Sequence, residues 1–192
     1  TLDAGEGQEV RVRAAEQLAR TPFLCAFQAE WFKFSLCTVH IYYGKSVADD
    51  PRRVREIEYI ADFLAGRAQR ESDVEGGAFI LLGDFNIFKP TDITMQKLTE
   101  AGFMVPEKLQ KLPEAVAKGK HYDQIAFLKT GGRIDRTEVQ AGMVDYYQSV
   151  FREGDKGHYE QQMVKPGTNP PEHYTSYSQW RTHQLSDHLP LW

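Results

Sequence analysis

A run of five apolar residues, Ala78 to Leu82, is bounded by glycines on both sides. A run that is short, wholly apolar and flanked by turn residues is typical of a strand at the centre of a sheet, covered on both faces. Residues 51–70 precede it and repeat apolar side chains at helical spacing, after the pair Asp50-Pro51, which is typical of a helix start. A buried strand next to an amphipathic helix predicts an α/β fold.

Further strands and a second helix are predicted along the chain by the same criteria. Only four residues, 28–31, join the first two strands, which favours an antiparallel pair. The sheet is therefore expected to be mixed, with helices outside it, rather than purely parallel. The expected strands are Phe23–Phe27, Phe32–Val39, Ala78–Leu82, Tyr122–Leu128 and the beginning of one at Leu189–Trp192, and the second helix is Thr91–Ala101.

The 192 residues, 41% of them apolar and 26% charged, are consistent with a single globular domain over residues 1–192. No apolar run is long enough to cross a bilayer. Residues 1–19 are expected to be a linker or an exposed helix. Residues 153–180 are rich in Gly, Pro, Lys, Tyr and His and are expected to form a long surface loop, whose aromatic side chains either stack on bases or sugars or pack together.

The formal net charge of −4, from 23 basic and 27 acidic residues, disfavours binding of duplex DNA through a basic stripe. The dense basic stretch Arg52, Arg53 and Arg55 is interpreted as a solvated helix face. Cys25 and Cys37 lie in apolar strands, so they are expected to be small buried hydrophobes rather than a disulfide or a zinc site. That usage favours a reducing compartment and hence the cytoplasm, while an amino-terminal targeting signal stays open.

The first candidate site residues are Asp84 and Asn86, which follow the central strand in the segment Gly83-Asp84-Phe85-Asn86. They are two residues apart, so in an extended backbone both side chains point to one side. A carboxylate suits a hard cation or an attacking water, and a carboxamide can donate to a phosphate oxygen. The alternative is an Asx-type turn, in which both side chains satisfy backbone groups.

Four further candidates also lie at or near strand ends, where a scaffold presents side chains to a cleft. In Ser186-Asp187-His188, Asp187 could hold a metal and His188 could exchange a proton near neutral pH, unless both only decorate the surface. Asp123 interrupts an apolar strand, where a histidine partner would offset its burial, unless it faces water at an edge. His40 follows an apolar strand and serves either the same cleft or the core.

Taken together and in order, these segments resemble the endonuclease/exonuclease/phosphatase superfamily, which includes pancreatic-type deoxyribonuclease and neutral sphingomyelinases. The resemblance runs from about Arg20 to Trp192, and its most specific parts are Gly-Asp-Phe-Asn and Ser-Asp-His. It implies a fold related to the deoxyribonuclease-like four-layer α/β/β/α sandwich. It also implies a nuclease or phosphatase that hydrolyses phosphodiester or phosphomonoester bonds with Mg²⁺ or Mn²⁺.

The same resemblance implies a role for each candidate residue. Asp84 and Asn86 resemble the residues that position the attacking water and the phosphate, and Asp187 resembles the carboxylate that helps bind magnesium. His188 resembles the catalytic histidine and Asp123 its partner. His40 is similar to the histidine that contacts the scissile phosphate, which makes it a catalytic and substrate-binding candidate like Asn86. Whether His188 or Asp84 activates the water is left open.

Members of the superfamily also carry an asparagine on the first strand and a metal-binding glutamate on a later one, both ahead of the histidine strand. None of Glu6, Glu9, Glu16 and Glu30 follows a buried strand in that way. The chain is therefore expected to be the carboxy-terminal part of the domain, with an incomplete sandwich whose first strands are missing. Magnesium would then be weakly held, activity would be low, and exposed sheet edges would favour self-association.

Two other classes of function stay open. A non-catalytic member, which keeps the fold as a binding or scaffolding module, is favoured by the missing glutamate. A serine hydrolase using Ser186, Asp123 and His188 is disfavoured, because Ser186 lacks the glycine-flanked elbow between strand and helix that such serines need. The substrate stays open among DNA, RNA, phosphoinositides and other phosphate esters.

Overall fold

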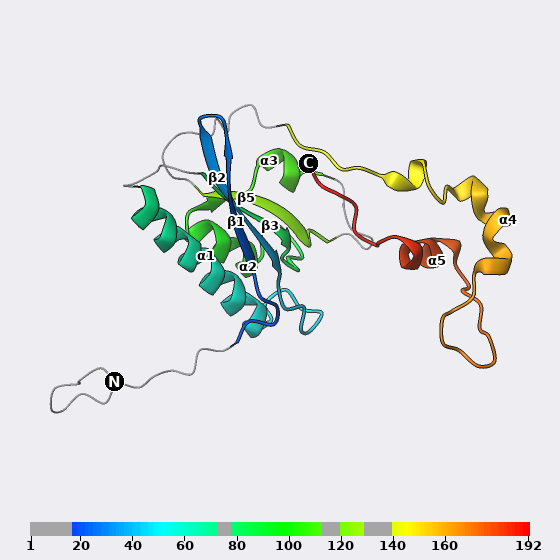
Figure 1. Ribbon diagram of the computed structural model, residues 1–192. Helices are drawn as coiled ribbons and strands as arrows, with labels where there is room; N and C mark the ends of the chain where they lie inside the picture. Colours follow the sequence, from blue (N-terminus) through cyan, green and yellow to red (C-terminus); the bar gives the residue numbers. More distant parts are fainter. Residues whose placement is uncertain (1–16, 73–77, 113–119, 129–139) are drawn as a thin grey trace.

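The computed structural model of the chain describes residues 17–72, 78–112, 120–128 and 140–192. The described part consists of a body, which is one five-stranded sheet with helices, and an arm, residues 140–192, which extends away from the body (Figure 1). This arrangement confirms the predicted α/β class. Most of the expected linker at 1–19 lies outside the described residues.

The sheet is mixed, as predicted, with the strand order β1-β2-β3-β5-β4. Strands β2 and β3 run parallel, and the other neighbours run antiparallel. The strands are β1 (Phe23–Ala29), β2 (Phe32–His40), β3 (Ala78–Asp84), β4 (Phe103–Met104) and β5 (Asp123–Leu128). The helices of the body are α1 (Pro51–Ser72), α2 (Ile93–Glu100) and α3 (Glu107–Gln110).

Helix α1 begins where the sequence predicts it, because Asp50 caps its first turn. The Asp50 Oδ1 atom accepts hydrogen bonds from the backbone N–H groups of Arg52 (3.1 Å) and Arg53 (3.3 Å). The apolar stripe of α1, which includes Ile57 and Leu64, is buried in the main core. Burying a side chain of this kind contributes roughly 1.5–3 kcal/mol, so the stripe fixes α1 against the sheet.

The two faces of the sheet differ in how they are covered. One face carries buried side chains such as Cys37, Leu81 and Ala126, which pack with α1 and α2 in the core. On the opposite face, called the open face here, Ile80 and Leu82 are only half-buried. The expectation that the central strand is covered on both faces is therefore wrong within the described residues, because an apolar run does not record how many layers cover it.

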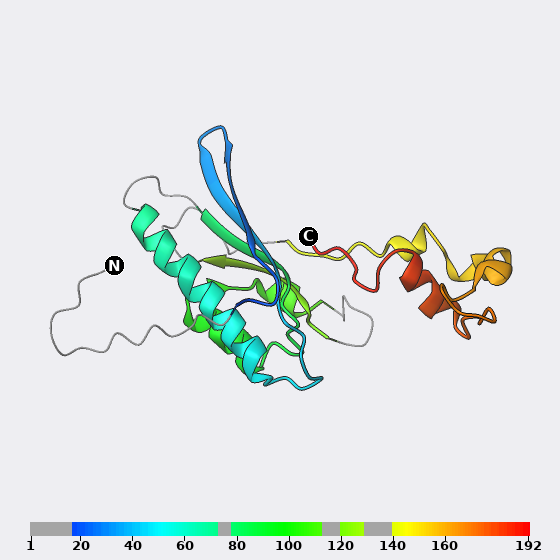
Figure 2. The same ribbon diagram turned by 60° about the horizontal axis from the view of Figure 1, so that its bottom comes forward.

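The hairpin formed by β1 and β2 extends past the other strands of the sheet (Figures 1 and 2). Its aromatic rings stack on one another, with ring centroids 5.4 Å apart for Phe27 and Phe34 and 5.3 Å apart for Phe32 and Phe34. Trp31 at the turn is 75% exposed. Strand β1 ends the described sheet on this side, and self-association through such an edge stays a prediction.

The arm differs from the surface loop expected over residues 153–180. It contains short helices, and its aromatic residues Tyr174, Tyr177 and Trp180 are buried in a small core of their own with Met163. The aromatic side chains therefore pack together, which is the second of the two alternatives for this segment. The helices are η1 (Tyr146–Gln148), η2 (Glu153–Asp155), α4 (Lys156–Tyr159), η3 (Glu160–Gln162) and α5 (Tyr177–Gln184).

Two segments join the arm to the body and run side by side (Figure 1). Gly142 and Trp192 exchange backbone hydrogen bonds of 2.8 and 3.0 Å, and Met143 forms an isolated antiparallel bridge with Leu191. The strand expected from Leu189 is thus reduced to this single bridge. Among the described helices, none has both the length and the apolar character needed to cross a membrane.

Candidate functional site

Strand register places three of the predicted site residues next to one another. His40 at the end of β2 is the partner of Asp84 at the end of β3, and Asp84 is in turn the partner of Asp123 at the start of β5. The His40 Nε2 atom lies 3.5 Å from the Asp84 Oδ2 atom. His40 is exposed, with its side chain 52% accessible, so it does not serve as a core histidine.

The arm brings a second histidine to this row. The His188 Nδ1 atom lies 2.7 Å from the Asp123 Oδ2 atom, although the two residues are 65 positions apart. The hydrogen bond to Asp123 raises the pKa of His188 above its ordinary value of 6.5, and the nearby charges of Asp84 and Asp187 act in the same direction. The imidazole is therefore protonated over a wider pH range than a free histidine.

Asp84 occupies a different electrostatic environment. Its side chain is only 16% exposed, and burial raises its pKa above the ordinary value of 3.8. The charge of Asp123 also raises the pKa, whereas the hydrogen bond from the backbone N–H of Asn86 lowers it (2.9 Å). The net effect is a carboxylate that holds a proton more readily than an exposed aspartate does.

Asn86 does not have the extended backbone expected for it. Its φ angle is 54°, and its backbone N–H donates to Asp84 Oδ1, which is the contact of an Asx-type turn. Its side chain is 3% exposed, and Nδ2 donates to the carbonyl of Ile41 (2.8 Å). Asn86 therefore ties the end of β3 to the residue that follows His40. A role of Asn86 at the phosphate stays a prediction.

Gly83 allows β2 and β3 to approach each other just before the site. Its φ angle is 132°, in the region that favours glycine. A Cβ atom at this position would clash with the carbonyl oxygen of Val39. Any larger residue would push apart the two strands that carry His40 and Asp84.

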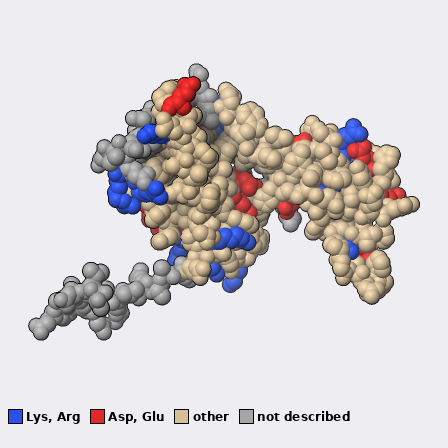
Figure 3. Space-filling view, in the orientation of Figure 1, with Lys and Arg blue, Asp and Glu red and all other residues tan. Residues whose placement is uncertain are grey.

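Asp187 precedes His188 and lies at the exposed rim of the site. Figure 3 shows acidic side chains gathered between the body and the arm. The Asp187 carboxylate is 56% exposed and lies 3.9 Å from His188 Nε2. An exposed carboxylate suits a hard cation such as Mg²⁺. However, no cluster of three or more histidine, cysteine or acidic side chains that could hold a metal exists within the described ranges. Asp187 alone supplies at most a part of a magnesium site.

A buried arginine holds the backbone segment that follows His40. The sequence interpretation missed this arginine. Arg53, expected on a solvated face, is completely buried. Its guanidinium group donates to four backbone carbonyls in the segment after His40. These acceptors are Tyr42 (3.3 Å), Tyr43, Lys45 (2.8 Å) and Val47 (2.9 Å).

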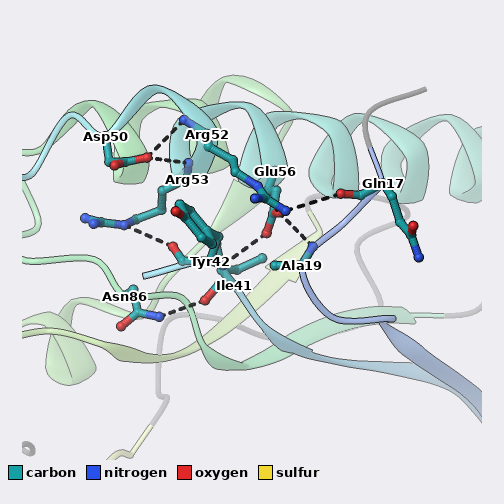
Figure 4. Close-up of polar contacts among 9 residues, drawn as sticks. All are labelled: Gln17, Ala19, Ile41, Tyr42, Asp50, Arg52, Arg53, Glu56 and Asn86. Carbon is teal, nitrogen blue, oxygen red and sulfur yellow. Dashed lines mark hydrogen bonds and ion pairs between the residues drawn. The ribbon is translucent and has the colours of Figure 1, made fainter. Parts of the chain in front are cut away.

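The signal for this burial was present in the helix periodicity. Arg53, Ile57, Ile60 and Leu64 are spaced by four, three and four residues and so share one face of α1. Asp50 and the buried Glu56 complete the support, because Glu56 Oε2 accepts the backbone N–H of Tyr42 (3.0 Å; Figure 4).

A cluster of aromatic rings lies between Arg53 and the imidazole of His188. The Tyr122 ring lies 5.5 Å from Phe88, 6.1 Å from Tyr43 and 6.3 Å from His188, measured between centroids. The Arg53 guanidinium lies 4.8 Å from the Phe88 ring. The body therefore packs one side of His188 with aromatic surface, which limits water on that side.

A hollow of about 300 Å³ adjoins the Asp123–His188 pair on the open face, lined by Leu82, Ile125 and Leu191 among others. Ser186, the nucleophile of the serine hydrolase alternative, accepts a hydrogen bond at Oγ from the backbone N–H of His188 (3.0 Å). That contact is a local turn, and it gives no support to a Ser–His proton transfer.

No protein-family model matches the sequence, and no curated protein matches it. Among solved structures, SmcL matches with a TM-score of 0.52 and 13% identity, over 86% of this chain and 55% of that one. The chain shares the fold of SmcL. This likeness supports the deoxyribonuclease-like α/β fold that the sequence predicts.

Two further solved structures match less closely, each with a TM-score of 0.35. The human nocturnin catalytic domain with bound sulfate is 16% identical, over 58% of this chain and 37% of that one. A functionally unknown conserved protein from Enterococcus faecalis V583 is 17% identical, over 50% of this chain and 38% of that one. The chain thus spans between 37% and 55% of the length of these three structures.

Proposed function

We propose that the chain belongs to a hydrolase of phosphate esters and carries its proton-transfer residues. The observation that supports this most strongly is the contact of 2.7 Å between Asp123 on β5 and His188 at the base of the arm. It places an oriented imidazole beside the row formed by His40 and Asp84. Such a set of neighbouring acids and bases is suited to the hydrolysis of an ester bond.

The opposite environments of the two central groups favour a division of roles. Asp84 has a raised pKa, so it accepts a proton from water more readily than an ordinary carboxylate does. His188 is more often protonated, so it can donate to a leaving oxygen or stabilise negative charge on the phosphate, while Asp123 fixes its tautomer. His40 is exposed and can contact the phosphate.

We include Mg²⁺ or Mn²⁺ in the proposal. Asp187 would contribute one carboxylate to the ion, and the other ligands would come from outside the described residues of the site. When bound, such an ion would offset the negative charge of the phosphate. Removal of divalent ions with EDTA is expected to abolish turnover, and added Mg²⁺ to restore it. Turnover that is unchanged in EDTA would remove the metal from the proposal.

The test is hydrolysis of bis(p-nitrophenyl) phosphate with Mg²⁺, followed as release of p-nitrophenol. His188→Ala is expected to lower kcat/KM by at least about 10²-fold, the lower limit of what a general acid–base group contributes. The matched control is His158→Ala, an exposed histidine on α4 of the same arm, which is expected to retain wild-type turnover. Equal activity of wild type and His188→Ala would overturn the proposal.

A non-catalytic binding module is the second candidate, and the lack of a complete metal-ligand cluster among the described residues favours it. It predicts that the wild type fails to hydrolyse phosphate esters at any concentration of Mg²⁺ or Mn²⁺. Turnover that depends on His188 would exclude this candidate.

A further inference from the structure

Two adjacent tyrosines of the arm hold the backbone that carries Asp187 and His188. The hydroxyl of Tyr146 lies 2.9 Å from the carbonyl oxygens of both Ser186 and His188. The hydroxyl of Tyr147 lies 2.6 Å from the Ser186 carbonyl oxygen and 3.1 Å from that of Arg181. Tyr146 thus donates to carbonyls on either side of the Asp187–His188 pair, and Tyr147 donates to two carbonyls that precede the pair.

The chemistry of a phenol suits this arrangement. Each hydroxyl has one proton to donate, so Tyr146 shares its proton between the two carbonyls that flank Asp187 and His188. Burial raises the pKa of Tyr147 to about 12, and the neighbouring Tyr146 adds to the shift. The phenol therefore remains a donor at every pH at which a histidine such as His188 titrates.

The tyrosines are themselves fixed by the arm. Their rings pack edge to face with centroids 4.7 Å apart, and the Arg181 guanidinium lies 4.5 Å from the Tyr147 ring. The backbone N–H of Tyr147 donates to Asp145 Oδ1 (3.0 Å). Arg181 belongs to α5, whose Trp180 is buried in the arm core. A continuous path of contacts thus joins the arm core to the backbone of His188.

We propose that Tyr146 and Tyr147 are positioning residues, which hold His188 against Asp123 and fix Asp187 at the rim of the site. The kinetic part of this inference rests on the proposed hydrolase function, whereas the structural part does not. In the described part of the site, His188 and Asp187 come from the arm, outside the strands of the sheet. Without the hydrogen bonds from Tyr146 and Tyr147, rotation of the backbone at residues 186–188 would separate the imidazole from Asp123.

The test compares Tyr146→Phe, Tyr147→Phe and the double variant with wild type by two measurements. The first is amide hydrogen exchange of residues 185–189, which needs no activity. The second is the turnover of bis(p-nitrophenyl) phosphate with Mg²⁺. The matched control is Tyr177→Phe, because the buried Tyr177 hydroxyl has no hydrogen-bond partner among the described residues, so its removal breaks no bond.

We expect faster exchange of residues 185–189 in each variant but not in Tyr177→Phe. We also expect kcat to fall about tenfold in the double variant with KM unchanged, as the loss of two hydroxyl donors predicts. In the His188→Ala background, the same substitutions should lower the residual turnover by a smaller factor than in the wild-type background, because the part of their effect that acts through His188 is already lost. If the tyrosines only stabilised the arm as a whole, their substitution would lower the turnover by the same factor in the wild-type and His188→Ala backgrounds.

Exchange rates equal to those of Tyr177→Phe would overturn the inference, and so would an unchanged kcat in an active enzyme. If the wild type shows no turnover, the proposed function fails and the exchange rates alone decide whether the tyrosines hold the segment. The single variants each keep one of the two hydroxyls, so they decide the matter if the double variant does not fold.

Discussion

The body and the arm are stabilised in different ways, and the candidate site lies where they meet. In the body, β2, β3 and β5 pair over five to seven residues each and bury an apolar core under α1 and α2. In the arm, helices of three to eight residues surround four buried side chains. The strands fix His40, Asp84 and Asp123 rigidly, whereas His188 depends on local contacts of the arm. Destabilisation should therefore displace His188 before it displaces His40, Asp84 and Asp123.

Substitution of Arg53 is expected to have the largest effect, because it disrupts the body. Arg53→Met leaves four backbone carbonyls without their donor and Asp50 without a buried cation, so the free energy of unfolding should fall by about 3–5 kcal/mol. Urea denaturation measures this loss. The exposed Arg70 provides the control on the same helix, since Arg70→Met should change stability by less than about 0.5 kcal/mol. An equal loss of unfolding free energy in the two variants would show that the buried hydrogen bonds of Arg53 do not stabilise the body.

Trp180→Ala should disrupt the arm and leave the body folded. The Trp180 ring packs against Phe151 (5.3 Å), Tyr159 (5.2 Å) and Tyr177 (5.6 Å), so its removal should cost roughly 3–5 kcal/mol within the arm. Hydrogen exchange should become faster over residues 145–185 and stay slow in β2, β3 and β5. If the strands lost protection to the same extent, the body and the arm would be one cooperative unit.

A pH titration should give the smallest effect and report on the junction itself. Because the pKa of His188 is raised in the folded protein, its contribution to stability is fully present below the ordinary pKa of about 6.5 and is lost as the pH rises through the folded value. The difference in unfolding free energy between wild type and His188→Gln should therefore shrink from pH 6 to pH 9. A difference for His188→Gln that grows with pH would have the wrong sign for a paired imidazole.

The sequence predicted the body better than the arm because the signals differ in length. The helix after Asp50 and the strand from Ala78 repeat their pattern over enough residues to be recognised. Strand β4 and the short helices around Trp180 span too few residues to show a period, and an aromatic cluster leaves no regular spacing. The sequence of residues 153–180 therefore predicts a loop.

The site residues at strand ends could be predicted from the sequence. The parts of the site that depend on local backbone conformation could not. His40, Asp84 and Asp123 end or begin neighbouring strands, so the topology brings them together. The positive φ angle of Asn86 could not be inferred from its spacing to Asp84. The support that Tyr146 provides to His188 joins residues 42 positions apart and has no sequence pattern.

The pairing of His188 with Asp123 can be measured directly as the imidazole Nδ1 proton in the NMR spectrum of the wild-type chain at low temperature. A proton held in a charge-assisted hydrogen bond of 2.7 Å is protected from exchange and strongly shifted downfield. We expect this resonance in the wild type and its loss in both Asp123→Asn and His188→Gln. A spectrum without a downfield imidazole proton, or one in which the proton persists in Asp123→Asn, would contradict the junction between the body and the arm.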